Sequence, residues 1–349
     1  MSGQPDKDLN TVQTADGSLT LRDRKTNELY HNSGGALLEA VENYVKPARL
    51  EGLLQRRGRA KTSDSNCTPT VGEDSETGTT GGTICASDDS TLRFLDVCFG
   101  LGYNTFAVWQ HVLNAPYLPF DKIEATAIEL DVELLKLWPT ILRQECFRTL
   151  NDALRDQSGK SISENLEALA RIGVPPKAVQ FNYQAREGPP FVLNMKFADL
   201  REAVPMLAME EPSSYDLIFH DPFSPRMMQQ FWTVELFKDY FNLLRPDCGV
   251  LLTYSAASAV RGGLIEAGFS IFRTKGVGVK NGGTLACRTG STELVDGLIF
   301  NMFEEEVERL KTVSGIPYRD PSRLDSTKEV LKRREQEQKM FKANQSQSV

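Results

Sequence analysis

The stretch that decides the fold is Leu92-Arg93-Phe94-Leu95-Asp96-Val97-Cys98-Phe99-Gly100-Leu101-Gly102-Tyr103-Asn104-Thr105. Its apolar and β-branched opening predicts a buried strand, and residues 105–112 predict a helix. The Gly-x-Gly turn between them lets the backbone bend tightly and lets a ligand lie against it. The start of the helix offers free N–H groups and a partial positive charge. A nucleotide-like cofactor fits such a turn, and a plain tight turn is the alternative.

The residue that follows the glycines separates two classes of cofactor site. A dinucleotide fingerprint needs a third glycine three residues after the second, and Thr105 stands there instead. This disfavours a nicotinamide or flavin site. An acid at the strand end followed by Gly-x-Gly is the pattern of methyltransferases that use S-adenosyl-L-methionine (SAM). We therefore expect Asp96, Gly100 and Gly102 to bind SAM.

Composition bounds the class of protein. The 349 residues are 40% hydrophobic, enough for one large or two modest cores. The chain has no run of eighteen apolar residues and no charged-then-apolar leader, so we expect a cytoplasmic protein without a membrane span. Its six scattered cysteines and three distant histidines predict reduced thiols and no metal. A net charge of −7 argues against nonspecific nucleic-acid binding but allows a local basic face.

Composition also divides the chain into four parts. Residues 1–57 predict a small hairpin and then an amphipathic helix, with Ser33 as its candidate cap. Residues 58–90 are rich in Ser, Thr, Gly and Asp, which predicts a disordered insertion. Residues 91–317 form the main domain, and residues 318–349 read as a charged tail with a loose helix.

Two further acids follow predicted strands. Glu129 ends the strand at 123–128, where a carboxylate can accept hydrogen bonds from both ribose hydroxyls of a cofactor; an ordinary acid at a helix start is the alternative. Asp199 follows the strand at 191–197, where it can accept from an adenine amine; a solvated surface acid is the alternative.

The stretch 215–225 ends a buried strand in Asp221-Pro222-Phe223. Proline stiffens the loop and leaves carbonyls able to accept from an amine, while the phenyl ring can lie against a planar base. Transfer of a methyl group to nitrogen needs an amine held by such acceptors. We expect Asp221 and Phe223 to be catalytic and Pro222 to contact the substrate. His220 should be structural, because alternation points it to the other face of the strand.

The remaining pattern predicts the architecture. A helix over 231–244, a strand over 249–254, a helix over 257–267 and a closing strand pair at 269–275 and 284–287 continue the alternation of strand and helix. We therefore expect an α/β, Rossmann-like fold with a mixed, mostly parallel sheet and an antiparallel last strand. Between residues 261 and 288 a local basic face fits phosphate contact, and a solvated surface is the alternative; its members are Arg261, Arg273, Lys275, Lys280 and Arg288. Of these we expect Arg261, Lys275 and Lys280 to contact the substrate.

Taken together, these stretches resemble the MnmC-like methyltransferases, the domain that completes 5-methylaminomethyl-2-thiouridine at the wobble position of certain tRNAs. The resemblance rests on Asp16-Gly17-Ser18, the segment from Tyr30 to Glu39, the glycine turn through Asn104, the Asp221 loop before Trp232, and the glycines around 262 and 276. It implies a class I SAM-dependent fold and adds Tyr30, Glu39 and Asn104 to the cofactor-binding set. It also implies N-methylation of a 5-aminomethyl group, with the tRNA anticodon stem-loop as partner.

Two departures from the family matter. The best-known members carry a C-terminal flavin-dependent oxidoreductase domain. We expect no such domain from the residues after Pro317, so this chain resembles the stand-alone methyltransferase form. Pro222 replaces a glycine of the family, which brings the loop closer to the Asp-Pro-Pro-Tyr loop of nitrogen methyltransferases. Methylation of another small-molecule or protein amine, or a non-catalytic SAM-binding protein, are the alternative functions.

Overall fold

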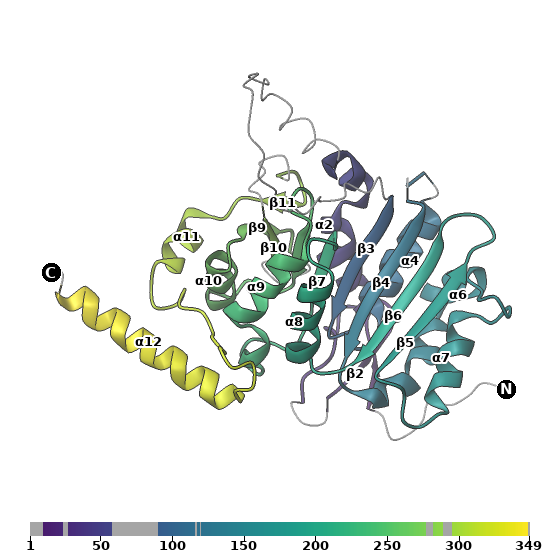
Figure 1. Ribbon diagram of the computed structural model, residues 1–349, viewed down its shortest axis with the longest axis horizontal. Helices are drawn as coiled ribbons and strands as arrows, with labels where there is room; N and C mark the ends of the chain where they lie inside the picture. The colour runs from purple at the N-terminus through teal and green to yellow at the C-terminus, as the bar shows by residue number, and fades with distance from the viewer. Residues whose placement is uncertain are drawn as a thin grey trace, which may run out of the picture.

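The computed structural model describes residues 10–23, 27–57, 90–115, 117–118, 120–276, 282–288 and 295–347. Within these ranges a nine-stranded sheet forms the centre of the molecule (Figure 1), in the order β11-β9-β10-β8-β7-β3-β4-β6-β5. Its strands are β3 (Thr91–Val97), β4 (Lys122–Glu129), β5 (Ala178–Gln184), β6 (Pro190–Phe197), β7 (Leu217–His220), β8 (Val250–Thr253), β9 (Ser270–Thr274), β10 (Thr284–Cys287) and β11 (Ile299–Phe300).

The strand directions confirm the predicted mixed sheet. Strands β8, β7, β3, β4 and β6 run parallel to one another, and β10 pairs antiparallel with both β8 and β9. Two antiparallel edge strands complete the sheet, β5 beside β6 and β11 beside β9. The chain places β4 on one side of β3 and β7 on the other, so the carboxyl ends of these strands meet at a topological switch point. Ligands of open α/β sheets bind there.

Alternating strand residues feed two cores, one on each face of the sheet. Phe94 and Phe219 lie in the first core, while Leu95 and Ile218 lie in the second. The helices of the first face are α1 (Ala36–Ala40), the π-helical turn η1 (Val41–Val45), α2 (Lys46–Ala48), α4 (Tyr103–Asn114), α5 (Trp138–Leu142), α6 (Glu145–Ala153) and α7 (Ile162–Ala170). Those of the second face are α8 (Leu200–Glu210), α9 (Val234–Leu243) and α10 (Ser258–Glu266).

The N-terminal extension forms the predicted hairpin, β1 (Thr11–Gln13) with β2 (Leu19–Leu21). Its turn supplies the cap of α1, because the Ser18 hydroxyl accepts from the amide of Ala36 (2.9 Å) and the Asp16 carboxylate from that of Leu38 (3.0 Å). The predicted cap Ser33 is exposed and makes no side-chain bond to the helix start, so that prediction is wrong. The insertion predicted over 58–90 lies outside the described residues except for Ser90.

The residues after Pro317 are attached to the second face of the sheet domain. The amide of Val234 donates to the carbonyl of Tyr318 (3.0 Å), and the amide of Asp320 donates to the Glu235 carboxylate (2.8 Å). After α11 (Glu304–Leu310) and this segment, α12 (Thr327–Gln347) runs along the edge of the molecule (Figure 1) with Val330 fully buried. The expectation of a loose tail therefore needs correction at its beginning, because residues 318–330 pack against the domain.

Candidate cofactor and active site

A cavity of about 730 Å³ lies at the carboxyl edge of the parallel strands. Its walls come from the segments that follow β3, β4, β6, β7 and β8, and from the N-terminal extension. The volume is typical of a site that buries a cofactor-sized ligand. Many of the predicted site residues line it: Tyr30, Glu39, Gly100, Glu129, Asp199, Asp221, Pro222 and Phe223.

The glycine turn bends through three residues with positive φ, namely Cys98 (62°), Gly100 (57°) and Gly102 (82°). Inside it the amide of Gly102 donates to the carbonyl of Phe99 (2.8 Å). The indole N–H of Trp138 donates to the carbonyl of Gly100 (2.7 Å). These bonds hold the backbone of Gly100 on the cavity wall.

Gly100 and Gly102 are needed for different reasons. A Cβ atom on Gly102 would lie 2.6 Å from the ring of Phe106 and 2.7 Å from that of Phe99. Gly102 is absent from the cavity wall, so its small size makes room for two core rings and not for a ligand. The structure therefore gives Gly102 a packing role, and its contact with SAM stays a prediction. A Cβ atom on Gly100, which does line the cavity, would lie 3.4 Å from the Tyr30 ring.

Glu129 joins the glycine turn to the end of β4. Its Oε2 accepts from the amide of Gly100 (2.7 Å), and its Oε1 accepts from the amides of Leu130 and Asp131 (2.8 Å each). Burial raises the pKa of Glu129, although these three amides oppose the rise. A carboxylate oxygen has two lone pairs, so Oε2 keeps one for a ligand. The geometry fits an acceptor for a ribose hydroxyl.

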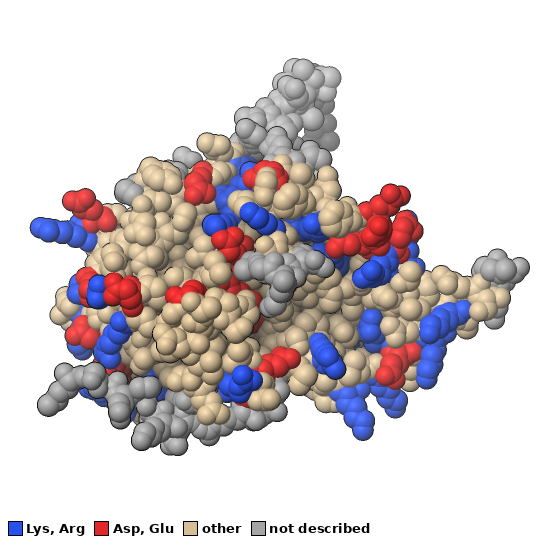
Figure 2. Space-filling view, turned by 180° about the vertical axis from the view of Figure 1, so that it is seen from behind, with Lys and Arg blue, Asp and Glu red and all other residues tan. Residues whose placement is uncertain are grey.

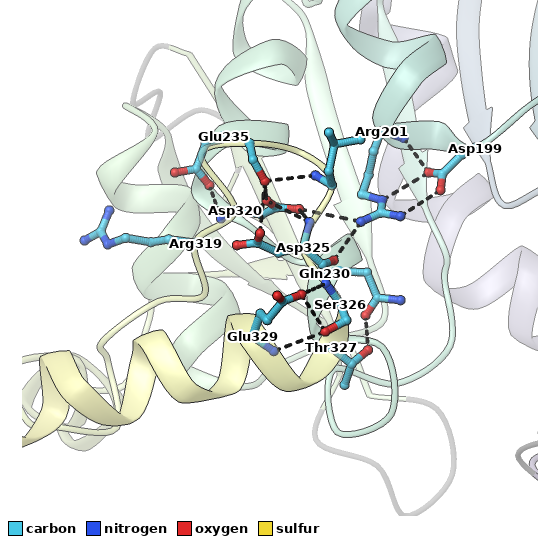
Figure 3. Close-up of polar contacts among 12 residues, drawn as sticks. Asp199, Arg201, Gln230, Glu235, Arg319, Asp320, Asp325, Ser326, Thr327 and Glu329 are labelled. Carbon is cyan, nitrogen blue, oxygen red and sulfur yellow. Dashed lines mark hydrogen bonds and ion pairs between the residues drawn. The ribbon is translucent and has the colours of Figure 1, made fainter.

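Asp199 follows β6 and caps the start of α8. Its Oδ1 accepts from the amide of Arg201 (2.8 Å), and its Oδ2 accepts from Nη2 of the same residue (2.9 Å). Figure 3 shows that the Arg201 guanidinium lies between Asp199 and the C-terminal segment, where it donates to the carbonyl of Asp325 (2.9 Å). A fixed carboxylate thus faces the cavity at the position predicted for adenine recognition.

Asp96 and Asn104 lie behind the cavity wall. Asp96 is fully buried and accepts from the amide (3.2 Å) and the hydroxyl (2.7 Å) of Thr105, which fixes the start of α4. Burial raises its pKa to about 8. The side-chain amide of Asn104 donates to the Asp221 carboxylate (2.9 Å). Neither residue lines the cavity, so the direct contacts of Asp96 and Asn104 with the cofactor stay predictions.

Asp221 enters the cavity from the end of β7. Burial raises its pKa to about 6; the nearby His31 lowers it and Glu39 raises it. The ring of Phe223 meets that of Tyr30 edge-on with centroids 5.0 Å apart, so the loop and the N-terminal extension close on each other beside the carboxylate. A carboxylate with this pKa can accept a proton near neutral pH.

The backbone carbonyls of the Asp221 loop already have partners. The Tyr254 hydroxyl donates to the carbonyl of Pro222 (2.9 Å), and the Trp232 indole donates to that of Phe223 (3.0 Å). The sequence predicted that these carbonyls would accept from an amine. Each of these bonds stabilises the loop and uses one of the two lone pairs of its carbonyl oxygen, so acceptance from an amine by these carbonyls stays a prediction. The Asp221 side chain is a further acceptor that the loop presents to the cavity.

His31 and Tyr254 are among the cavity residues that sequence reasoning missed. The Nδ1 atom of His31 lies 3.7 Å from Oε2 of Glu39, and its ring packs edge-on against Tyr103. Tyr254 directly follows β8, so the rule that found Glu129 at a strand end could have found it. A lone histidine beside Tyr30 carries no such signal.

The predicted basic face is not a set of free cations. Arg261 is only 2% exposed; it donates to the Thr284 hydroxyl (2.9 Å) and to the Glu306 carboxylate (2.8 Å). Its burial contradicts the predicted phosphate contact. Lys275 is exposed just past β9 and away from the cavity wall, and Lys280 lies outside the described residues. On the face drawn in Figure 2, Lys and Arg lie among Asp and Glu, as the net charge suggests.

Three other expectations concern structural and absent features. His220 is fully buried among Trp232, Phe237 and Tyr240, which confirms its structural role. Within the ranges that the structure describes, no group of three or more His, Cys, Asp or Glu side chains is arranged to hold a metal ion. No helix in those ranges has both the length and the apolar character that a membrane crossing requires.

Comparison with known proteins gives three findings. Residues 166–289 match a family described as S-adenosyl-L-methionine-dependent methyltransferase. An uncharacterised protein of Methanocaldococcus jannaschii is 26% identical over 95% of this chain and 73% of its own length. The bifunctional protein MnmC of Vibrio vulnificus, named for tRNA 5-methylaminomethyl-2-thiouridine biosynthesis, is 29% identical over 52% of this chain, which spans only 25% of that protein.

Among solved structures, the fold resembles the crystal structure of MnmC2 from Aquifex aeolicus. The TM-score is 0.59 at 22% sequence identity, and the match covers 93% of this chain and 82% of the other. This likeness confirms the Rossmann-like architecture.

Proposed function

We propose that the chain is an MnmC-like methyltransferase that uses SAM, and that it methylates an amine nitrogen, that of a 5-aminomethyl group on a wobble uridine of tRNA. The observation that carries the proposal is Asp221. Its carboxylate is held at 2.9 Å by Asn104, lies on the cavity wall beside Phe223, and has a pKa raised to about 6 by burial.

The residues of the cavity fit SAM. Glu129 would accept from the ribose hydroxyls through the free lone pair of Oε2, and Asp199 would accept from the adenine amine. The backbone of Gly100 would lie against the amino-acid end, under the edge of Tyr30. When bound there, SAM supplies an electrophilic methyl group. The chain's own contribution is to hold the cofactor at the strand ends, beside the Asp221 loop.

Asp221 would act on the acceptor amine. An alkyl ammonium has no lone pair for attack, so a proton must leave before or during methyl transfer. A carboxylate with a pKa near 6 is ionised at neutral pH, where it can orient the N–H bonds and receive that proton. The flat ring of Phe223, fixed edge-on to Tyr30, offers a surface against which the base of the acceptor can lie.

The choice of tRNA as substrate is supported by the MnmC relatives, whose name states the modified nucleoside. The chain spans about a quarter of the length of those bifunctional proteins, so their substrate comes to this chain as a proposal. A tRNA substrate would also place the reaction in the cytoplasm. Because Arg261 of the predicted basic face is buried and paired with Glu306, we expect recognition of a local anticodon structure and not of the whole phosphate backbone.

The test is methyl transfer from radiolabelled SAM to three acceptors: tRNA that carries the unmethylated 5-aminomethyl group, the same tRNA already methylated, and a lysine-rich protein mixture. We expect label in the first tRNA alone, at the wobble nucleoside after digestion. Label in the protein mixture alone would replace tRNA by a protein amine. SAM binding without transfer to any of the three acceptors would favour a non-catalytic SAM-binding protein.

A further inference from the structure

We propose that residues 320–329, here called the C-terminal brace, position the adenine-facing wall of the SAM cavity through Arg201. The brace lies far from the glycine turn in sequence and contributes no residue to the cavity lining. It acts through two contacts on neighbouring elements. Arg201 and Asp320 are therefore positioning residues, and their role rests on the proposed placement of adenine at Asp199.

The first contact is the Arg201 guanidinium, which binds both sides at once (Figure 3). On the cavity side Nη2 donates to Oδ2 of Asp199 (2.9 Å), and Nε to Oδ1 (3.3 Å). On the brace side Nη1 donates to the carbonyl of Asp325 (2.9 Å) and lies 3.6 Å from the Asp320 carboxylate. A planar guanidinium holds a carboxylate in one orientation only when it is itself fixed, and the brace supplies that fixation.

The second contact joins the brace to η5 (Gln229–Phe231), which belongs to the same wall of the cavity. The Thr327 hydroxyl donates to the side chain of Gln230 in η5, against which α12 packs. Phe231 of this turn lines the cavity, and the Arg201 guanidinium lies 5.6 Å from its ring centroid. One cation thus contacts two cavity residues, and the brace contacts both the cation and the turn that carries Phe231.

The brace is held in a defined conformation by its own hydrogen bonds, and this lets it fix the position of Arg201. Asp320 is 1% exposed, and its carboxylate accepts from the Ser322 hydroxyl (2.8 Å) and from the amide of Asp325 (3.2 Å). Its amide is tied to Glu235 on α9. The amide of Ser326 then donates to the Glu329 carboxylate (2.8 Å), which starts α12. Asp320 is the centre of this arrangement, because it closes the loop and faces Arg201.

Loss of the brace should therefore weaken SAM binding without touching the SAM site. With Asp320 replaced by alanine, the loop at 320–325 loses the bonds from Ser322 and Asp325 to that carboxylate, so the Asp325 carbonyl no longer holds Arg201 in one place. Asp199 then samples orientations that do not face adenine, and ordering it again on binding costs affinity. The expected loss for Asp320→Ala is roughly fivefold to tenfold in Kd, the scale of one well-placed hydrogen bond.

A double-mutant cycle separates positioning from general damage. SAM affinity is measured by calorimetry for the full-length parent chain, Asp320→Ala, Asp199→Ala and the double variant, with folding checked by thermal unfolding. If the brace acts through Asp199, Asp320→Ala should cost fivefold to tenfold in the parent but less than about twofold in the Asp199→Ala background. Asp320→Asn, which keeps an acceptor for Ser322 and Asp325, should lose less.

Arg334→Met is the matched control. Arg334 ties α12 to the carbonyls of Ile316 (2.6 Å) and Ser314 (3.1 Å), away from Arg201, so its loss should leave SAM affinity unchanged. Equal losses for Asp320→Ala in both backgrounds, or no loss in the parent, would overturn the brace. Unchanged affinity in Asp199→Ala would instead remove Asp199 from the adenine site, which is a failure of the proposed function.

Discussion

Asp96 and Asp221, on neighbouring strands, both have a raised pKa, but only one of them is placed where it can exchange a proton with a substrate. Asp96 precedes the end of β3, and Asp221 follows the end of β7. Burial is the first cause of the raised pKa in both residues, to about 8 and about 6 respectively. The Asp96 carboxylate accepts a hydrogen bond from Thr105 inside the core, whereas the Asp221 carboxylate lies on the cavity wall. Only the second can exchange a proton with a substrate.

Asp221→Asn should separate binding from catalysis. The variant should keep SAM affinity within about threefold and lose turnover on the order of 10²-fold, because Asn104 and the cavity shape remain while the proton acceptor is gone. The parent rate should rise with pH through about 6 as the carboxylate ionises, and continue to rise as the amine deprotonates. Steady-state rates from pH 5 to 9 should show the lower inflection in the parent and not in the variant. Unchanged turnover would remove Asp221 from the mechanism.

Asp96→Asn should change how stability depends on pH. The folded pKa of about 8 lies above the ordinary value of 3.8, so the folded state binds the extra proton between these values. The stabilisation is complete below pH 4 and is lost as pH rises to about 8, with a slope of up to about 1.4 kcal/mol per pH unit. Urea unfolding from pH 5 to 9 should show a shallower decline in the variant. An identical slope in both proteins would mean that Asp96 is ionised when folded.

The two glycines of the turn should respond differently to alanine. Gly102→Ala should lower the free energy of unfolding by about 2 to 4 kcal/mol, because a Cβ at φ 82° meets the rings of Phe106 and Phe99. Gly100→Ala has only the backbone cost of about 1 to 2 kcal/mol, but it adds a methyl group to the cavity wall. Calorimetry on the folded fraction should show weaker SAM binding for Gly100→Ala alone. Equal losses of affinity would return Gly102 to the ligand site.

At the scale of elements, the hairpin turn at 16–18 positions α1 and with it Glu39. Asp16→Ala should lower the free energy of unfolding by about 1 to 2 kcal/mol, because the amide of Leu38 and the side chain of Ser18 lose their acceptor. Ser33→Ala is the control, since the exposed hydroxyl of Ser33 contacts no helix amide, and it should be neutral. Chemical denaturation measures both. A destabilised Ser33→Ala would restore the sequence-based assignment of the cap.

The elements also show how far the sequence could predict this site. Apolar runs ended by an acid placed Glu129, Asp199 and Asp221 at one sheet edge, because parallel strands bring their carboxyl ends together. The same pattern could not tell Gly100 from Gly102, or a free Arg261 from one paired with Glu306, since both depend on side chains that arrive from distant elements. The C-terminal brace could not be predicted for the same reason. The high charge of residues 318–349 is typical of a solvated tail, and their contacts with Arg201 and Glu235 depend on the fold.

At the scale of the whole molecule, three parts of the chain enclose one cavity. The sheet edge supplies the acids, the N-terminal extension covers them with Tyr30 and His31, and the C-terminal brace supports the wall at Asp199 (Figures 1 and 3). A ligand in the cavity would touch the first two parts directly and would be coupled to the third through Arg201. Binding should therefore stabilise segments that lie hundreds of residues apart in sequence.

Amide hydrogen exchange with and without SAM measures this coupling. At a SAM concentration of about 100 Kd, linkage stabilises the folded chain by about 2.7 kcal/mol, so exchange that needs global unfolding should slow everywhere. Fast exchange through local opening reports instead on which segments SAM binding orders. It should slow at the glycine turn, around Tyr30, and in residues 320–329, because ordering Asp199 also orders Arg201 and its partner Asp325. In Arg201→Met the protection at 320–329 should disappear while that at the glycine turn remains. Protection confined to the cavity lining in the parent chain would mean that the sheet edge binds SAM without the brace.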